Sequence, residues 1–170
     1  MSAHGLENAV GEAERIRLDI AVSPAAGTAA PRARGTVARA IRAAQGVAGP
    51  VAGSIGVLLT DDTAIRGLNR QWRGIDKATN VLAFPAAVAP RVGSRLASRH
   101  LGDIAISCET AAREARADAR PFAHHLAHLA VHGFLHLLGH DHQSNRAAEE
   151  MEALERSILA RLGIPDPYRT

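Results

Sequence analysis

The segment HGFLHLLGHDH, residues 132–142, decides how this chain is interpreted. His132 and His136 are four residues apart, so on a helix of about 3.6 residues per turn both side chains lie on the same face. Gly139 can adopt a left-handed turn that ends the helix and brings His142 back toward the same point. Three imidazoles with an open fourth position are typical of a catalytic zinc site.

A general base is missing from this segment. Metzincin proteases have histidines at the same spacing, but they carry a glutamate, their general base, directly after the first histidine. Gly133 occupies that position here. Because a glycine costs a helix roughly 1 kcal/mol relative to alanine, we expect it to serve a need for space or for a close backbone approach.

A ligand set that contains His128 is the alternative to this assignment. Seven of the nine histidines lie between residues 124 and 142, so some of them are not ligands. On a helix, however, His128 and His136 are some 12 Å apart, and the face rotates with each step of four residues. We therefore assign His132, His136 and His142 as the metal ligands.

The polar residues around this cage have plainer interpretations. We expect His124 and His125 to be surface or packing residues and His140 to be incidental. Asp141 either orients a ligand imidazole from outside the cage or stabilises the turn beside Gly139, and both roles stay open. The acidic residues of the last predicted helix are interpreted as a solvated face: Glu149, Glu150, Glu152 and Glu155.

Hydrophobic periodicity predicts an α+β fold. Strands are expected over residues 16–22, 54–60, 80–84 and 102–107, and helices over 34–45, 61–72, 108–119, 121–138 and 144–162. Residues 85–100 have no periodicity and are expected to form a long mobile loop. The result is a single compact domain over residues 15–165: a four-stranded mixed sheet packed with about five helices, with the metal site at the end of a C-terminal helix. Residues 1–14 are expected to be an unstructured extension.

Composition agrees with one domain in a reducing compartment. A chain of 170 residues, 46% of them hydrophobic, is long enough for one core and short for two. Cys108 is the only cysteine, which excludes an internal disulfide and fits a buried structural thiol. No apolar run approaches the roughly 20 residues that span a bilayer, so we expect a cytoplasmic protein without a membrane partner.

The charge balance favours nucleic acid as a partner only mildly. The formal net charge is +3 and the pI is about 9.9. Aromatic residues make up only 3% of the chain, so extensive base stacking is not expected. Binding to a nucleic acid should therefore depend on phosphate contacts and weaken with salt.

Three motifs in sequence order resemble one family. Residues 132–142 match H-G-x-L-H-L-x-G-x-D-H, the signature of the YbeY family of bacterial endoribonucleases and ribosomal RNA maturation factors. LNRQWRGIDKATNVLAFP, residues 68–85, is similar to that family's L-N-x-x-y-R-G-x-D-x-x-T-[DN]-V-L-S-F-P, and LGDIAIS, residues 101–107, resembles its next strand. One departure is Ala83, where the family commonly has serine.

The resemblance implies a function and a substrate site. It implies a zinc-dependent endoribonuclease that is specific for single strands and acts in late-stage processing of the 16S ribosomal RNA 3′ end and in ribosome quality control. Arg73 would face the metal cleft and, with His132 and His136, carry catalysis, because a planar guanidinium grips two phosphate oxygens at once. Asn69 and Asn80 would bind substrate. Its partners would be ribosomal RNA and the small ribosomal subunit, with a small-subunit ribosomal protein or an assembly GTPase as candidates for a directing protein.

Two mechanisms and two rival functions stay open. Without a glutamate base, either a water activated by the metal or the 2′-hydroxyl of the RNA attacks phosphorus, and only the second route is closed to DNA. A zinc peptidase shares the cage but lacks its base at Gly133. The stronger rival is a non-catalytic ribosome assembly factor whose metal holds the last helices together.

Overall fold

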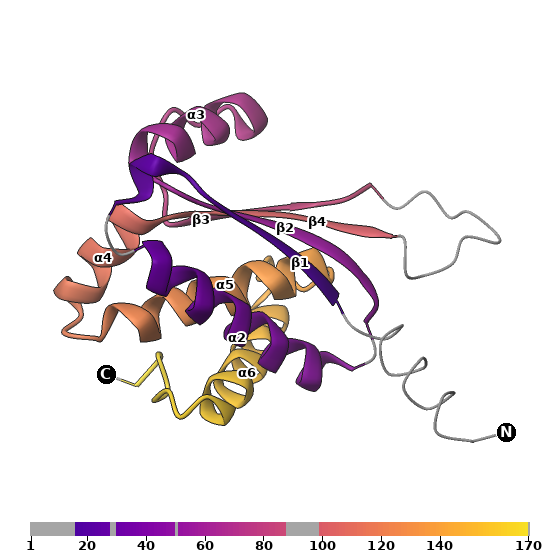
Figure 1. Ribbon diagram of the computed structural model, residues 1–170. Coiled ribbons are helices and arrows are strands. Elements are labelled where there is room, and N and C mark those ends of the chain that lie inside the picture. Colours follow the sequence, from indigo (N-terminus) through magenta and orange to yellow (C-terminus); the bar gives the residue numbers. More distant parts are fainter. Residues whose placement is uncertain (1–15, 28–29, 50, 88–98, 170) are drawn as a thin grey trace, which may run out of the picture.

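The computed structural model describes residues 16–27, 30–49, 51–87 and 99–169. A four-stranded sheet in the order β1-β2-β4-β3 forms its centre, with β1, β2 and β4 parallel and β3 antiparallel at the edge (Figure 1). The strands are β1 (Ile16–Val22), β2 (Gly53–Thr60), β3 (Val81–Pro85) and β4 (His100–Ser107). The sheet is therefore mixed, as the sequence predicts.

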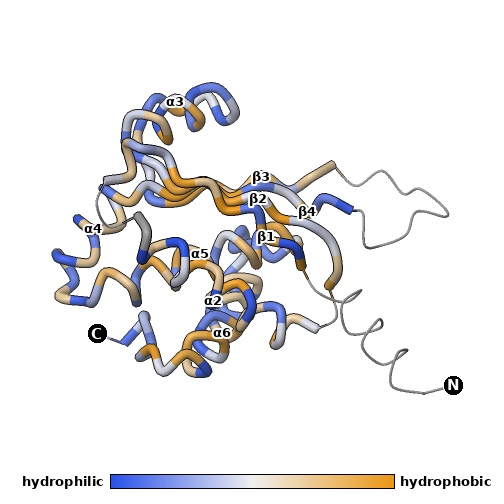
Figure 2. The backbone as a smooth tube through the Cα atoms, in the orientation of Figure 1, coloured by the Kyte–Doolittle hydropathy of each residue, from blue (hydrophilic) through white to orange (hydrophobic). Residues whose placement is uncertain are grey.

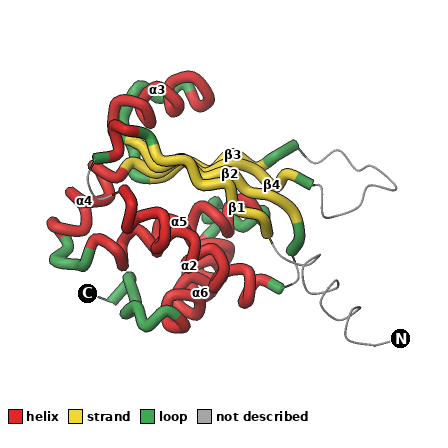
Figure 3. Tube along the Cα trace, viewed as in Figure 1, coloured by secondary structure: helices red, strands yellow, loops and turns green. Residues whose placement is uncertain are grey.

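The helices divide between the two faces of the sheet. They are α2 (Ala30–Ala48), α3 (Asp62–Arg73), α4 (Cys108–Ala117), α5 (Phe122–Leu137) and α6 (Asn145–Arg161), with a short 3-10 turn, η1 (Pro24–Ala26), after β1. Figure 3 shows α2, α5 and α6 on one side of the strands and α3 on the other. Among the described residues, no helix is long and apolar enough to cross a membrane.

Helix α5 lies at the centre of the larger layer. It packs against α2, α4, α6, β3 and β4, and ten of its sixteen residues are buried. A helix with partners on most sides must be apolar on most sides, and the sequence FAHHLAHLAVHGFLHL meets this demand except at its histidines. In Figure 2 the middle of the sheet is orange, the colour of hydrophobic residues, whereas much of α3 is blue.

Gly133 lets α5 approach the sheet closely. A Cβ atom at this position would lie 3.0 Å from Cγ2 of Ile104 on β4, a side chain that is only 1% exposed. The expected need for space at this glycine is therefore confirmed. The contact brings the histidine face of α5 to the edge of the sheet beside β3.

The edge strand β3 separates two clusters of apolar side chains. Val81 and Ala83 pack against the main core on the α5 side. Leu82 and Phe84 pack on the α3 side, with Ile65 and Ala105. This is the alternation that a strand between two layers requires.

The predicted elements all exist; β1 has the predicted bounds, and the ends of the others are shifted. Asp61 caps α3 as predicted, since its carboxylate accepts a hydrogen bond from the Ala64 amide at 2.9 Å. Gly139 adopts the predicted left-handed turn, with φ 92°. The first helix is longer than the predicted 34–45, because the chain around it is rich in alanine and Pro31 is tolerated in a first turn. The predicted extension, 1–14, and residues 88–98 of the predicted loop lie outside the described residues.

The close approach at Gly133 predicts a difference between two glycine-to-alanine variants. Gly67 lies in α3, and a Cβ atom there would meet nothing within 4 Å. Because both variants gain the same helix propensity, the difference between their free energies of unfolding measures the effect of the contact with Ile104. We expect Gly67→Ala to have a free energy of unfolding about 1–3 kcal/mol higher than Gly133→Ala, measured by urea titration. Equal gains in the two variants would contradict the packing role.

Candidate metal centre

Three histidines converge at the end of α5. His132 and His136 come from the last two turns of the helix, and His142 comes from the loop that follows it. Each offers one ring nitrogen, and these three nitrogens all lie within 4.8 Å of one another. The Nε2 atoms of His132 and His136 are 3.1 Å apart, close to the roughly 3.3 Å that separates two nitrogen ligands of tetrahedral zinc. The donor set therefore fits a zinc ion.

The turn after α5 holds His142 in place. The Gly139 amide donates to the His136 carbonyl at 3.0 Å, and the His140 amide donates to the Leu135 carbonyl at 3.1 Å, so the helix ends in a tight reversal. The carboxylate of Asp141 accepts a hydrogen bond from the Gln143 amide at 3.2 Å. This contact corresponds to the second role considered for Asp141, which is to stabilise the turn.

Glu155 on α6 orients His132. Its carboxylate lies 2.7 Å from Nδ1 of His132, and because an ionised carboxylate only accepts hydrogen bonds, Nδ1 carries the proton and donates it. The lone pair of His132 is then on Nε2, which faces the other two histidines. This arrangement of carboxylate, histidine and metal position is typical of zinc sites.

Glu155 is buried and ionised. Its side chain is 0% exposed, and burial alone would raise its pKa, but hydrogen bonds from His128, His132 and Tyr168 outweigh burial and lower the pKa to about 2. The interpretation of Glu155 as part of a solvated acidic face is therefore wrong. The missed signal was its spacing, because Glu155 lies on the same helical stripe as Met151 and Ile158, both of which are buried.

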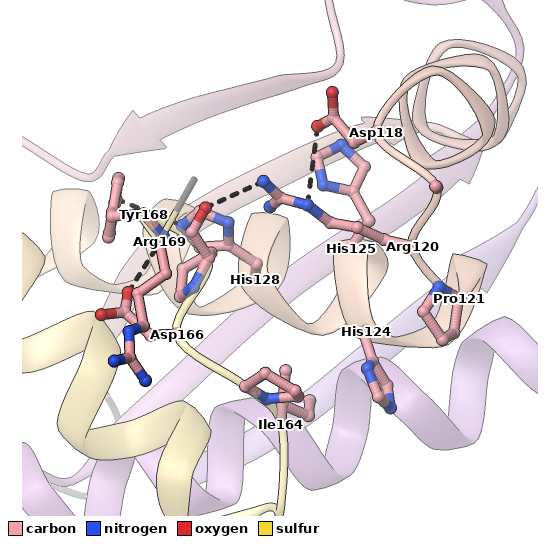
Figure 4. A pocket seen from close by; sticks show the side chains of 13 residues that line it. Asp118, Arg120, Pro121, His124, His125, His128, Ile164, Asp166, Tyr168 and Arg169 are labelled. Atoms are coloured by element: carbon pink, nitrogen blue, oxygen red, sulfur yellow. Dashed lines mark hydrogen bonds and ion pairs between the residues drawn. The ribbon is translucent and has the colours of Figure 1, made fainter.

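His128 and Tyr168 close the far side of this carboxylate. Nε2 of His128 lies 2.9 Å from Glu155, and the Tyr168 hydroxyl also donates to it. Burial and the neighbouring carboxylate raise the pKa of Tyr168. Both side chains line a cavity of about 510 Å³. The cavity is shown in Figure 4, and at its border Arg120 donates a hydrogen bond to the Pro167 carbonyl. His128 is thus a partner of Glu155 and lies outside the histidine cluster.

His136 is suited to bind a metal at neutral pH. Burial lowers its pKa, and the nearby His132 and His142 lower it further, against opposing contributions from the His140 backbone and Glu155. A pKa below the ordinary value of 6.5 leaves the imidazole neutral at pH 7. Its lone pair is then available without the loss of a proton.

Arg73 reaches this cluster from the other layer. It ends α3, and its guanidinium donates to the Ala83 carbonyl of β3 at 3.2 Å. A pocket of about 390 Å³ opens beside it, lined by Arg73, Asn80, Val81, Ala83, Pro85, His132, Gly133, His136 and His142. None of these described lining residues carries a carboxylate, so the pocket favours an anion.

Of the other predicted substrate residues, one lines the pocket and one does not. The Asn80 amide is held by the Glu114 carboxylate at 3.0 and 3.2 Å, and Glu114 is held in turn by His125 at 2.7 Å. Asn69 is 5% exposed and donates to the Lys77 carbonyl at 2.8 Å, so it supports the loop after α3 from outside the pocket. His125 is buried, as expected of a packing residue.

Comparisons with known proteins agree on one family. The model of the family described as Endoribonuclease YbeY matches residues 27–163. A protein of Bradyrhizobium sp. named Endoribonuclease YbeY is 64% identical over 116 residues, which are 67% of this chain and 68% of the relative. A protein of the same name from Rhodopseudomonas palustris (strain ATCC BAA-98 / CGA009) is 59% identical over 138 residues, 80% of this chain and 72% of the relative.

A solved structure shares the fold. The solution structure of TM1509 from Thermotoga maritima superposes with a TM-score of 0.52 at 22% sequence identity, covering 92% of this chain and 100% of that one. At this identity the match supports the fold alone.

The contact between Glu155 and His132 predicts how metal affinity depends on α6. Glu155→Gln keeps the size of the side chain but loses its charge, so we expect zinc affinity to fall about 10- to 100-fold, measured by competition with a chelator. Glu150→Gln is the matched control, because Glu150 is exposed on the same helix and pairs only with Arg146. His142→Ala should weaken binding more than either. Unchanged affinity in Glu155→Gln would rule out the orienting role.

Proposed function

The chain belongs to the Endoribonuclease YbeY family, and we propose that it is a metal-dependent endoribonuclease that cleaves single-stranded RNA. One observation carries the proposal: three convergent histidines and Arg73 line the same pocket, and none of its described lining residues carries a carboxylate. Such a pocket attracts an anion, and the phosphate groups of RNA are anions.

We propose one zinc ion per chain, held by His132, His136 and His142. Imidazole nitrogens suit zinc, whereas magnesium and calcium take oxygen ligands. The ion would supply Lewis-acid chemistry at the scissile phosphate. Glu155 keeps the His132 ring in the orientation that ligation needs.

Arg73 binds the scissile phosphate in this proposal. Its guanidinium is exposed at the pocket and fixed by the Ala83 carbonyl, so nitrogen atoms remain for two phosphate oxygens and for the charge that develops in the transition state. Asn80, held by Glu114, flanks the same phosphate. Asn69 contributes by supporting the loop that carries Asn80, since its own amide is bonded to Lys77.

The attacking group is open between water and the 2′-hydroxyl of the RNA. Gly133 supplies no base, and the described residues that line the pocket offer only histidine, asparagine and arginine as polar side chains. Cleavage of a DNA strand of the same sequence distinguishes the two routes, because DNA lacks the 2′-hydroxyl.

We further propose that the substrate is ribosomal RNA, in late-stage processing of the 16S 3′ end and in ribosome quality control in the cytoplasm. The family supports a role in ribosomal RNA processing, and the small net charge of +3 supports weak binding to naked RNA. Specificity then comes from the small ribosomal subunit, and from a ribosomal protein or an assembly GTPase that directs the enzyme.

A non-catalytic assembly factor with a structural metal is the alternative. It is favoured by one observation: the histidine cluster fixes the loop between α5 and α6, so a bound ion would stiffen the C-terminal part of the fold. A zinc peptidase is less well supported, because the pocket lacks the carboxylate that such an enzyme uses as its base.

Catalysis predicts that Arg73 and the metal act together on RNA. With purified zinc-loaded protein and a labelled single-stranded RNA, we expect Arg73→Ala to lower the cleavage rate by a factor on the order of 10² to 10³, and Arg73→Lys to recover little of it. His136→Ala should abolish cleavage. Arg70→Ala, on the same helix but outside the pocket, is the control and should cleave normally. Full activity in Arg73→Ala would exclude Arg73 from the cleavage step, and a native protein that cleaves no RNA would favour the assembly factor.

The proposed ribosomal substrate predicts a defect in cells. Replacing the native gene with His136→Ala should leave 16S ribosomal RNA with unprocessed 3′ ends, because metal binding is lost while the fold remains. The measurement is to map the 3′ ends of 16S ribosomal RNA in these cells and in control cells that carry Arg70→Ala. Normal 3′ ends in the His136→Ala cells would place the substrate elsewhere.

A further inference from the structure

An apolar groove lies on the opposite side of β3 from the metal pocket. It has a volume of about 520 Å³ and runs between α3 and the open face of the sheet. Its apolar walls are formed by Leu58, Leu68, Trp72, Phe84 and Ala105. This size lies in the range of pockets that bind small planar molecules.

Trp72 is an unusual feature of this groove. It is 65% exposed, more than any other large hydrophobic residue that the structure describes, and it is the only tryptophan of the chain. Its ring lies 6.2 Å from the ring of the half-buried Phe84, tilted by 58°. Two aromatic faces therefore border the same open groove.

The groove and the metal pocket meet at Pro85, on the edge strand of the sheet. Trp72 precedes Arg73 on α3, and Phe84 lies between Ala83 and Pro85 on β3. Trp72 and Phe84 line the groove, whereas Arg73 and Ala83 line the metal pocket, and Pro85 borders both. Only the width of the edge strand separates the two sites.

The charges of the two sites differ. The groove contains two carboxylates, Asp19 and Asp103, on β1 and β4, which disfavour a phosphate. Both carboxylates are exposed, and each has a cationic or imidazole neighbour, Arg17 and His100 respectively. A neutral planar group with N–H donors is favoured, because its faces stack on the aromatic rings and its edge meets carboxylate acceptors.

We propose that this groove is a nucleobase subsite of the RNA. The base adjoining the scissile phosphate stacks on Trp72 while its phosphate contacts Arg73, so the strand bends around β3. This inference rests on the proposed function. It adds one stacked base to a protein whose low aromatic content predicted little base stacking. Five aromatic residues are few, but two of them lie together beside the site.

Fluorescence of Trp72 tests the subsite directly, because the chain has no other tryptophan. Zinc-loaded protein is titrated with a short 2′-O-methyl RNA strand and with an abasic phosphodiester chain of the same length. We expect the RNA to change the tryptophan emission and the abasic chain to leave it unchanged. The abasic chain should also bind more weakly.

Two variants measure the contribution of the ring. We expect Trp72→Ala to weaken RNA binding about 5- to 100-fold, the effect of losing one stacked base, and Trp72→Phe to recover most of the affinity. Binding is followed with a labelled strand. Ile75→Ala is the matched control, since Ile75 is also exposed, at 52%, but does not line the groove. It should bind as the native protein does, and circular dichroism should show the native fold in all three.

Two results would overturn the subsite. The first is equal binding of the RNA and the abasic chain, and the second is unchanged RNA affinity in Trp72→Ala. Base-dependent quenching in a protein that cleaves no RNA would retain the subsite and reject the nuclease. If the native protein cleaves RNA and Trp72→Ala binds RNA with native affinity, the nuclease is retained and the subsite is rejected.

Discussion

The buried carboxylate of Glu155 is the constraint on which the functional half of this structure depends. An ionised group without exposure must be compensated by hydrogen bonds, and Glu155 receives them from His128, His132 and Tyr168. These bonds join α5, α6 and the C-terminal segment, so one residue sets both the packing of the last helix and the tautomer of His132. Substitution of Glu155 would disturb both at once.

The edge strand β3 organises the rest of the site. Alternate residues of a strand face opposite sides, so Ala83 borders the metal pocket while Phe84 borders the groove beside Trp72. Arg73 lines the same pocket as the histidines and is bonded to the Ala83 carbonyl of this edge strand. The close contact at Gly133 brings α5 near enough for this, since a wider separation between helix and sheet would move the histidines away from Arg73.

Local pattern predicted the fold and the convergence of three histidines, but not the carboxylate that orients one of them. His132, His136 and His142 lie within one helix and its turn, so spacing alone brings them together. Arg73 comes from a distant segment, and only the family resemblance placed it at the cleft. Glu155 was misassigned because acidic neighbours at 149, 150 and 152 suggested a solvated face, although it follows Met151 by one helical turn. The groove at Trp72 was missed because composition counts aromatic residues and gives no information about where they meet.

The connections of Glu155 also bear on whether a bound metal would be structural. Among the described residues, the candidate ligands come from α5 and the loop after it, and none comes from α6. Helix α6 is already joined to α5 by two carboxylate–imidazole hydrogen bonds, to His128 and His132, and by its apolar stripe. An ion in the cluster would therefore add little to the attachment of the last helix. Structural zinc sites close with four protein ligands, whereas three ligands beside an exposed arginine leave a position for a reacting group. The proposed chemistry on a phosphate therefore accounts for these features better than a structural metal does.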